Sequence, residues 1–275
     1  MKINLEKVIH FDEVSFGYGQ HKVLDEISFD ILSGDYLAVI GPNGGGKTTL
    51  LKLLLGLIEP QQGRIEILGM PPGRHGGRIG YMPQYTTVSG TFPITVRDAV
   101  LMGKVSPGFK GVFGLRFGNS SGGEVEKALD RVGMLEHIDR RVSDLSGGQK
   151  QRVFIARAIV DEPKMLLLDE PAASVDQAGK SGLYCLLKEL NQEMTIVMVS
   201  HDISVLGEGV KSVACVNRKV HLHDQPKITR ELLSEAYGET IKGTCPIELI
   251  THGELPHRVL EFHPESDDNE GDWNA

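Results

Sequence analysis

Short apolar runs alternate along the chain with segments of helical periodicity. Residues 36–40, 165–168 and 195–199 are almost wholly apolar, which is typical of strands buried on both faces of a parallel sheet. Helical patterns follow at residues 48–55, after the first run, and at residues 178–190, between the other two. Strands that alternate with helices in this way predict an α/β fold with a parallel sheet and helical crossovers.

The N-terminal part has a different pattern. Residues 8–16 and 23–31 alternate loosely between apolar and polar positions, with glycine and glutamine in the turn between them. This alternation predicts two strands joined by a turn. Residues 65–68 and 78–82 are interpreted as further strands.

The middle of the chain departs from both patterns. Glycine, proline and serine become frequent from residue 85 onwards, and we expect an inserted, mostly helical segment with a mobile loop at residues 106–123. Helical patterns then occupy residues 124–132 and 149–160. Beyond residue 243 the pattern decays, and the acidic end at residues 265–272 is predicted to be disordered.

Composition narrows the class of protein. The 275 residues are 40% hydrophobic and 24% charged, as in ordinary soluble globular proteins. The net charge of -8 argues against nucleic acid as the main partner, because phosphate contacts need clustered Lys and Arg. No run approaches the roughly 18 apolar residues that cross a bilayer, and the N-terminus lacks the apolar core of a signal peptide. We therefore expect a cytosolic chain, with Cys185, Cys215 and Cys245 as ordinary thiols in a reducing compartment.

A glycine-rich loop lies between the apolar run at residues 36–40 and the helical pattern that follows it. The pattern Gly41-x4-Gly46-Lys47-Thr48 fits the phosphate-binding P-loop, whose glycines let backbone N–H groups converge on phosphate oxygens. The helix beginning near Lys47 adds a positive dipole end. Lys47 is expected to reach the β- and γ-phosphates, and the Thr48 hydroxyl to bind Mg²⁺. The predicted loop comprises Gly41, Pro42, Asn43, Gly44, Gly45, Gly46, Lys47, Thr48 and Thr49.

Two adjacent carboxylates end the apolar run at residues 165–168. Strands of an open parallel sheet deliver side chains from their carboxyl ends into the ligand crevice. Asp169 is therefore predicted to hold the metal, and Glu170 to orient and polarise the attacking water. The alternative is a pair of plain solvated charges, which the P-loop upstream disfavours.

A second candidate anion site lies at Leu145, Ser146, Gly147, Gly148 and Gln149. Ser146 is expected to cap a helix that starts near Lys150, and the glycines to expose its N–H groups. A simple helix cap is the alternative. Because one chain has no obvious need for two phosphate clamps, we expect a dimer in which each second clamp closes on the partner's nucleotide.

Together these motifs resemble the nucleotide-binding subunit of an ABC transporter, from about residue 8 to residue 238. The resemblance implies a P-loop NTPase (RecA-like) parallel-sheet core, an N-terminal antiparallel β subdomain and an inserted α-helical subdomain at about residues 86–160. It implies one ATPase domain at residues 1–240, followed by a C-terminal extension at residues 241–275. ATP and Mg²⁺ are the implied cofactors.

The resemblance also implies roles for residues outside these motifs. Gln84 resembles the Q-loop glutamine, which contacts Mg²⁺ and the attacking water and couples the site to the membrane partner. His201 resembles the switch histidine that senses the γ-phosphate, and Asp176 the D-loop aspartate, although Val175 replaces the more usual leucine. Tyr18 resembles the aromatic residue that stacks on adenine, a role that Phe16 could fill instead.

Particular stretches resemble the ATPases of zinc and manganese, sometimes iron, uptake systems. These are residues 91–103, 41–46, 216–223 and 232–238. The implied partners are a second copy of the chain, integral membrane permease subunits and, indirectly, an extracytoplasmic substrate-binding protein, with the chain on the cytoplasmic face of the cell membrane. ATPases of importers for iron-siderophores or cobalamin are related alternatives. Non-transport soluble ABC ATPases fit less well, since they usually carry two cassettes or a long coiled coil.

Histidines cluster towards the C-terminus, and imidazole is a good zinc ligand. A regulatory metal site is therefore one hypothesis, and a polar strand with a solvated tail is the alternative. The histidines are His221, His223, His252, His257 and His263.

Overall fold

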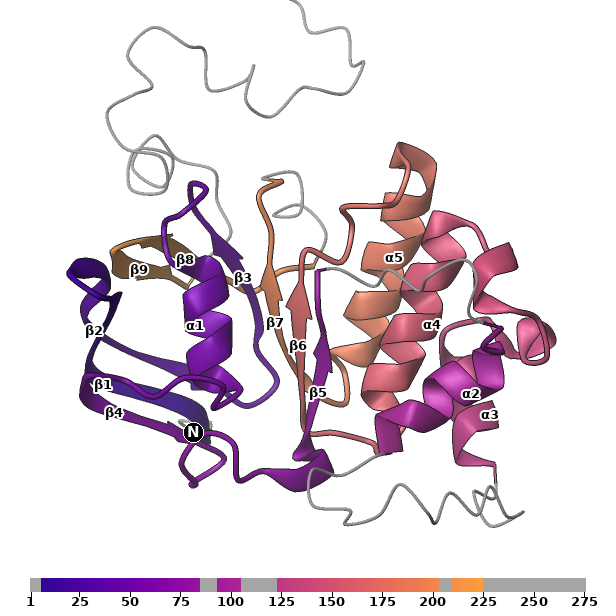
Figure 1. Ribbon diagram of the computed structural model, residues 1–275, viewed down its shortest axis with the longest axis horizontal. Coiled ribbons are helices and arrows are strands. Elements are labelled where there is room, and N and C mark those ends of the chain that lie inside the picture. Colours follow the sequence, from indigo (N-terminus) through magenta and orange to yellow (C-terminus); the bar gives the residue numbers. More distant parts are fainter. Residues whose placement is uncertain (1–5, 85–92, 105–122, 203–208, 225–275) are drawn as a thin grey trace, which may run out of the picture.

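A six-stranded sheet forms the centre of the computed structural model, which describes residues 6–84, 93–104, 123–202 and 209–224. Its strand order is β5-β6-β7-β3-β8-β9 (Figure 1). The first five strands are parallel and the last is antiparallel to its neighbour. The strands are β3 (Tyr36–Ile40), β5 (Ile79–Met82), β6 (Met165–Asp169), β7 (Thr195–Val199), β8 (Ser212–Asn217) and β9 (Lys219–His223).

The three apolar runs of the sequence form the middle of this sheet. All residues of β3, β6 and β7 are buried. Side chains alternate between two cores, so that Tyr36, Ala38 and Ile40 face one and Leu37 and Val39 face the other, as the two-residue period of a strand requires. The predicted parallel sheet is thus confirmed.

A separate antiparallel sheet covers one face of the central sheet. Its order is β2-β1-β4, formed by β1 (Lys7–Tyr18), β2 (His21–Leu32) and β4 (Gln62–Ile67). Helix α1 (Lys47–Leu54) shares a core with both sheets (Figure 1). The strands predicted at residues 8–16 and 23–31 are correct but too short, because cross-strand hydrogen bonds continue into the polar turn residues that carry no apolar signal. The strand predicted at residues 65–68 begins three residues earlier and ends one residue earlier than expected.

Helices cover the other face. They are α2 (Val96–Leu101), α3 (Glu124–Arg131), α4 (Gly147–Ile159) and α5 (Gln177–Leu190), and short 3₁₀ turns lie at η1 (Gly76–Arg78), η2 (Met102–Lys104), η3 (Leu135–His137) and η4 (Val142–Asp144). Their buried side chains share one core with that face of the sheet. None of the helices in the described ranges is long and apolar enough to span a membrane.

One helix boundary was predicted wrongly. Helix α4 begins at Gly147 and not near Lys150. The capping box between Ser146 and Gln149 satisfies the first N–H groups and so lets two glycines adopt helical geometry despite their low helix propensity.

Some predictions fall outside the described residues. These are most of the loop at 106–123, the acidic end, residues 232–238, Cys245 and the histidines at 252, 257 and 263. The division of the chain at residue 240 also stays a prediction.

Candidate functional site

The glycine-rich loop connects β3 to α1 as predicted. Gly41, Gly44 and Gly46 have φ angles of 150°, 78° and 111°, which residues other than glycine rarely adopt. A Cβ at Gly41 would lie 2.1 Å from the carbonyl oxygen of Val216, at the end of β8. The glycines are therefore required both by backbone conformation and by the close approach of the neighbouring strand.

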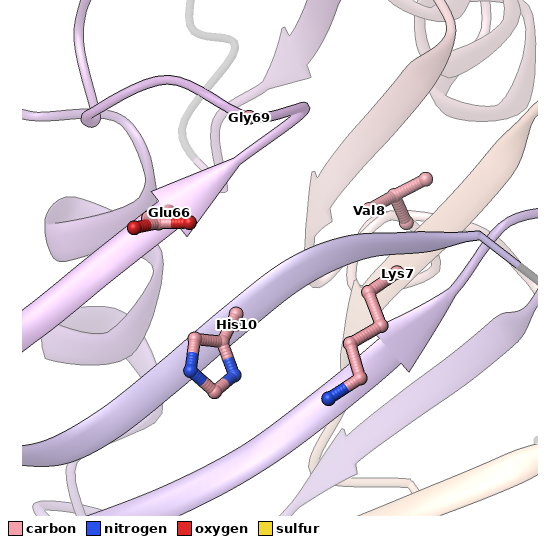
Figure 2. A pocket seen from close by; sticks show the side chains of 5 residues that line it. All are labelled: Lys7, Val8, His10, Glu66 and Gly69. Carbon is pink, nitrogen blue, oxygen red and sulfur yellow. The ribbon is translucent and has the colours of Figure 1, made fainter.

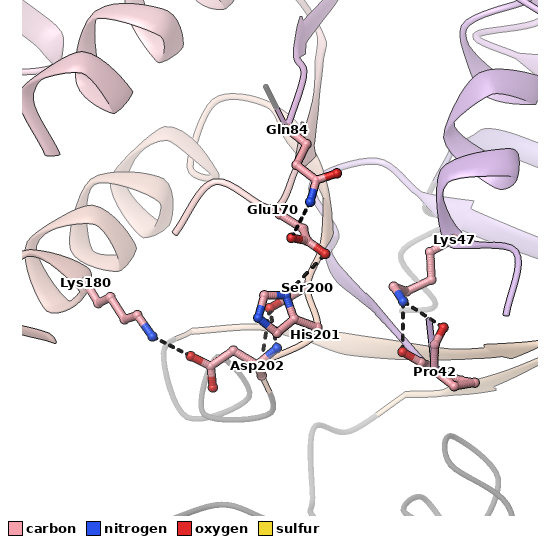
Figure 3. Close-up of polar contacts among 9 residues, drawn as sticks. Pro42, Lys47, Gln84, Glu170, Lys180, Ser200, His201 and Asp202 are labelled. Carbon is pink, nitrogen blue, oxygen red and sulfur yellow. Dashed lines mark hydrogen bonds and ion pairs between the residues drawn. The ribbon is translucent and has the colours of Figure 1, made fainter. Parts of the chain in front are cut away.

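The Lys47 side chain is hydrogen-bonded to the backbone of its own loop. Its ammonium nitrogen donates to the carbonyl oxygens of Gly41, at 2.8 Å, and of Pro42, at 3.0 Å (Figure 3). Burial lowers the pKa of Lys47, and the carboxylates of Glu170 and Asp169 oppose that shift. The loop thus holds a buried cation whose charge is offset by the carboxylates of Glu170 and Asp169.

Asp169 is the last residue of β6 and is 4% exposed. In the sheet it pairs with Val199, which pairs with Val39, so the carboxylate is level with the end of β3, where the glycine loop begins. Burial, and then the charge of Glu170, raise the pKa of Asp169 to about 6, against the effect of Lys47 and Lys52. Its Oδ1 has no hydrogen-bond partner among the described residues, as expected of an oxygen that binds a cation or its water.

Glu170 is the next residue, and its carboxylate contacts two side chains that follow other strands. The Gln84 amide donates to its Oε2 at 2.7 Å, and Nδ1 of His201 lies 3.2 Å from Oε1 (Figure 3). The three residues follow β5, β6 and β7. The φ of Glu170 is 49°, an uncommon conformation for a side-chain-bearing residue that is often found at functional sites. The structure therefore brings together the three residues that were predicted to be catalytic.

The donor set suits a magnesium nucleotide. Thr48, Gln84 and Asp169 offer a hydroxyl, an amide and a carboxylate oxygen, and Mg²⁺ prefers oxygen ligands. Space is open around Gly44, where an added Cβ would meet nothing within 4 Å. The loop can therefore admit phosphate oxygens while α1 presents its N-terminus to them.

The second candidate anion site lies at the start of α4. The Ser146 hydroxyl accepts a hydrogen bond from Gln149 N at 3.3 Å, and Gln149 Oε1 accepts one from Ser146 N at 3.0 Å. A Cβ at Gly147 would lie 2.4 Å from the carbonyl oxygen of Ser174, so this turn packs closely against the segment that precedes α5. There Asp176 caps the helix by accepting from Gly179 N at 2.9 Å.

The two candidate anion sites begin helices on opposite faces of the six-stranded sheet. Buried side chains of α1 belong to one core and those of α4 to the other, on opposite faces of the six-stranded sheet (Figure 1). In the part of the chain that the structure describes, no hydrogen bond or ion pair joins Ser146, Gly147, Gly148 or Gln149 to the glycine loop.

Tyr18 lies at the end of β1 and is 50% exposed. Its ring packs edge-on against Phe16, with 5.0 Å between the ring centres and 86° between the planes. Phe16 is 8% exposed and has little free face to offer. The geometry therefore favours Tyr18 over Phe16 as a stacking platform.

Sequence reasoning missed a pair of charges beside His201. Lys180 Nζ lies 2.7 Å from Asp202 Oδ2, and Asp202 N donates to the Ser200 hydroxyl at 3.0 Å (Figure 3). This pair connects the first turn of α5 to the segment that carries His201. The only local signal was a lysine four residues after Asp176 and an aspartate next to His201.

A hollow of about 170 Å³ lies elsewhere, on the antiparallel sheet. It is lined by Lys7, Val8, His10, Glu66 and Gly69 (Figure 2). Lys7 Nζ and His10 Nδ1 each lie 2.6 Å from Asp30, so these groups already have a partner within the sheet. The hollow contains none of the predicted site residues.

His221 and His223 lie in β9. The described residues contain no group of three or more His, Cys, Asp or Glu that could hold a metal ion. The other three histidines of that hypothesis lie outside the described ranges, so the regulatory metal site stays a prediction.

Comparison with known proteins finds relatives that share one family. A family model described as ABC transporter matches residues 24–173. The zinc uptake system ATP-binding protein ZurA of Listeria monocytogenes is 38% identical over 221 residues, which are 78% of this chain and 85% of that protein. The zinc transport system ATP-binding protein TroB of Treponema pallidum is 37% identical over 239 residues, 86% of this chain and 89% of that protein. A chain from an ABC transporter solved in an inward-facing conformation is 33% identical with a TM-score of 0.72, covering 84% of this chain and 88% of that one.

Proposed function

Since the chain belongs to the ABC transporter family and is an ATP-binding subunit of it, we propose that it hydrolyses ATP to power uptake of a divalent metal ion, zinc or manganese. The observation that carries the hydrolytic part is the Glu170 carboxylate, held between Gln84 and His201 across from Lys47. A fixed carboxylate beside a phosphate cradle is what activation of a water for attack on the γ-phosphate requires.

Each residue has a defined task in this proposal. Lys47 exchanges the carbonyls of Gly41 and Pro42 for β- and γ-phosphate oxygens, and Glu170 orients the attacking water. His201 holds Glu170 and senses the γ-phosphate. Mg²⁺, bound through Thr48, Gln84 and Asp169, would neutralise charge on the β- and γ-phosphates. Tyr18 stacks on the adenine.

A second copy of the chain would complete the site. The Ser146 hydroxyl and the N–H groups of Gly147 and Gly148 would cap the γ-phosphate held by the partner's glycine loop, with Gln149 and Asp176 at the same interface. The separation of α1 and α4 by the sheet supports this arrangement. Closure would exclude water and strengthen every charge interaction in the site.

The proposed cargo rests on the relatives. ZurA and TroB are named for zinc uptake and zinc transport, and each is matched over more than four-fifths of its length. By analogy the chain would sit on the cytoplasmic face of the cell membrane against permease subunits. An extracytoplasmic protein would deliver the metal.

The test is ATP hydrolysis by the chain reconstituted with its permease in vesicles. Adding the binding protein loaded with Zn²⁺ or Mn²⁺ should raise turnover several-fold, and the metal-free binding protein should not. Stimulation by a loaded siderophore- or cobalamin-binding protein alone would contradict the cargo. Failure of the chain to associate with any permease would contradict the transport role.

Glu170→Gln is the matching variant. Loss of the carboxylate should lower kcat by at least about 100-fold while ATP binding is retained, and an ATP-stabilised dimer should appear in size-exclusion chromatography. Glu189→Gln, an exposed change in α5, serves as control. Normal hydrolysis by Glu170→Gln would remove Glu170 from its role.

A further inference from the structure

His137 lies beside the capping turn of α4. The residue belongs to the short turn η3, and its side chain is 13% exposed. Its Nε2 lies 3.1 Å from Nε2 of Gln149. Gln149 is also the capping-box partner of Ser146. The histidine therefore contacts the side chain that fixes the proposed nucleotide-capping residue.

The hydrogen-bond pattern determines the orientation of the Gln149 amide. Ser146 N–H can only donate, and it donates to Oε1 of Gln149. The NH₂ group of Gln149 consequently points at His137 and donates to its Nε2. An imidazole that accepts at Nε2 is neutral and carries its proton on Nδ1.

We propose that His137 is a positioning residue for the nucleotide-capping turn at Ser146, and that it makes ATP hydrolysis by this chain depend on pH. The inference rests on the function proposed above and deepens it, since it concerns the same shared site. His137 acts through Gln149 and contacts no nucleotide itself.

Protonation would remove this support. A protonated His137 is a donor at Nε2 and faces the NH₂ donor of Gln149. If the amide rotates to offer its oxygen, the NH₂ group then faces Ser146 N–H, so one hydrogen bond is lost in either orientation. The turn is thus held by the neutral form of His137 and loosened by the protonated form.

Among the described residues, Glu136 is the charged side chain that lies within ion-pair distance of the His137 ring. Glu136 of the same turn has Oε1 at 3.6 Å from Nε2 and is 80% exposed. From α3, Arg131 is paired with Glu193 at 2.7 Å. Asp139, two residues on, lies 3.9 Å from Arg97 of α2. From α4 the facing group is the neutral Gln149, with Lys150 next in sequence.

Three variants test the proposal through kcat for ATP between about pH 6 and about pH 8. His137→Gln offers an amide oxygen that accepts at all pH values, so kcat should stay within about twofold of wild type at about pH 8 and fall less in acid. His137→Leu removes the acceptor and should lower kcat roughly fivefold. KM for ATP should change little, because the ATP is bound by the partner's glycine loop.

Gln149→Glu is the sharpest variant. A carboxylate can accept from Ser146 N–H with one oxygen and from a protonated His137 with the other. The ratio of kcat at about pH 6 to kcat at about pH 8 should therefore rise above the wild-type ratio. His21→Gln, an exposed change on β2, should keep the wild-type profile.

Two results would overturn the inference. One is a His137→Gln profile that superimposes on wild type. The other is a nitrogen NMR spectrum of the intact protein at about pH 8 that shows His137 protonated on Nε2. The NMR measurement does not depend on catalysis. Active wild type with unchanged variant profiles would remove this inference alone, whereas a chain without ATPase activity but with the expected tautomer would remove the proposed function.

Discussion

At the scale of single residues, two buried polar groups bear on cation binding and on the pH dependence of stability. Asp169 is nearly excluded from solvent and its Oδ1 has no hydrogen-bond partner among the described residues. Such a group costs stability unless a ligand satisfies it. The unpartnered Oδ1 therefore supports the proposed role of Asp169 in holding Mg²⁺.

His75 is a second buried polar group, remote in role from the site. It is 6% exposed, and neither ring nitrogen has a hydrogen-bond partner within the described ranges. Burial, followed by the charge of Arg78, lowers its pKa. The folded protein therefore holds the neutral ring, while the unfolded chain gains a proton below its ordinary pKa of about 6.5.

This difference predicts acid sensitivity. Stability that is present above about pH 6.5 should be lost as the pH falls towards the lowered pKa of folded His75. Between about pH 7 and about pH 5, the free energy of unfolding of His75→Leu should therefore fall less than that of wild type, by on the order of 1 kcal/mol. Urea denaturation at the two pH values measures both. His21→Leu, an exposed change, should keep the wild-type slope. An equal slope in all three proteins would contradict the assignment.

At the scale of elements, one arginine links three segments of the helical layer. Arg152 in α4 donates to the carbonyl oxygen of Val132, at 2.9 Å, and to that of Gly182, at 3.2 Å. The first acceptor follows the end of α3 and the second lies in α5. The helix that carries the capping turn is thus tied to both of its neighbours.

Arg152→Met should lower the free energy of unfolding by about 2 kcal/mol, because two carbonyl groups lose a charged donor. Arg131→Met is the matched control, since Arg131 makes a surface ion pair with Glu193. It should cost less than about 1 kcal/mol. Chemical denaturation of both variants provides the measurement, and equal losses would show that Arg152 has no special role.

At the scale of the whole molecule, the two candidate anion sites begin helices that pack on opposite faces of the sheet. In the proposed function, each glycine loop therefore lacks its cap until a second copy approaches. Consider a dimer of one chain with a defective glycine loop and one chain with a defective cap. It would contain one complete site, formed by the intact loop of the second chain and the intact cap of the first.

Mixing defective chains tests this directly. Lys47→Ala and Ser146→Arg should each be nearly inactive alone. An equal mixture should recover about a quarter of the wild-type turnover if chains pair at random and sites act independently. A mixture of Lys47→Ala with Glu170→Gln, both defects of the loop side, should stay inactive. No recovery in the first mixture would contradict the shared site.

Sequence alone identified the elements whose chemistry is local. The strand, glycine loop and helix at residues 36–54 are specified by neighbouring residues, because apolar runs, φ requirements and helix caps act over a few positions. The carboxylates of Asp169 and Glu170 were found for the same reason. The role of Gln84 came from resemblance alone, and that of His201 from resemblance together with its place just after an apolar run.

Only the tertiary structure decided what meets what. Gln84 and His201 contact Glu170 because the strand order places β5, β6 and β7 side by side with their ends level, and sheet order is a non-local property of packing. The link from His137 to Gln149 and the tie of Arg152 to α3 and α5 likewise join segments that the chain keeps apart. The local sequence pattern thus determined the elements and the candidate site residues. The packing of distant segments determined which of these residues are in contact.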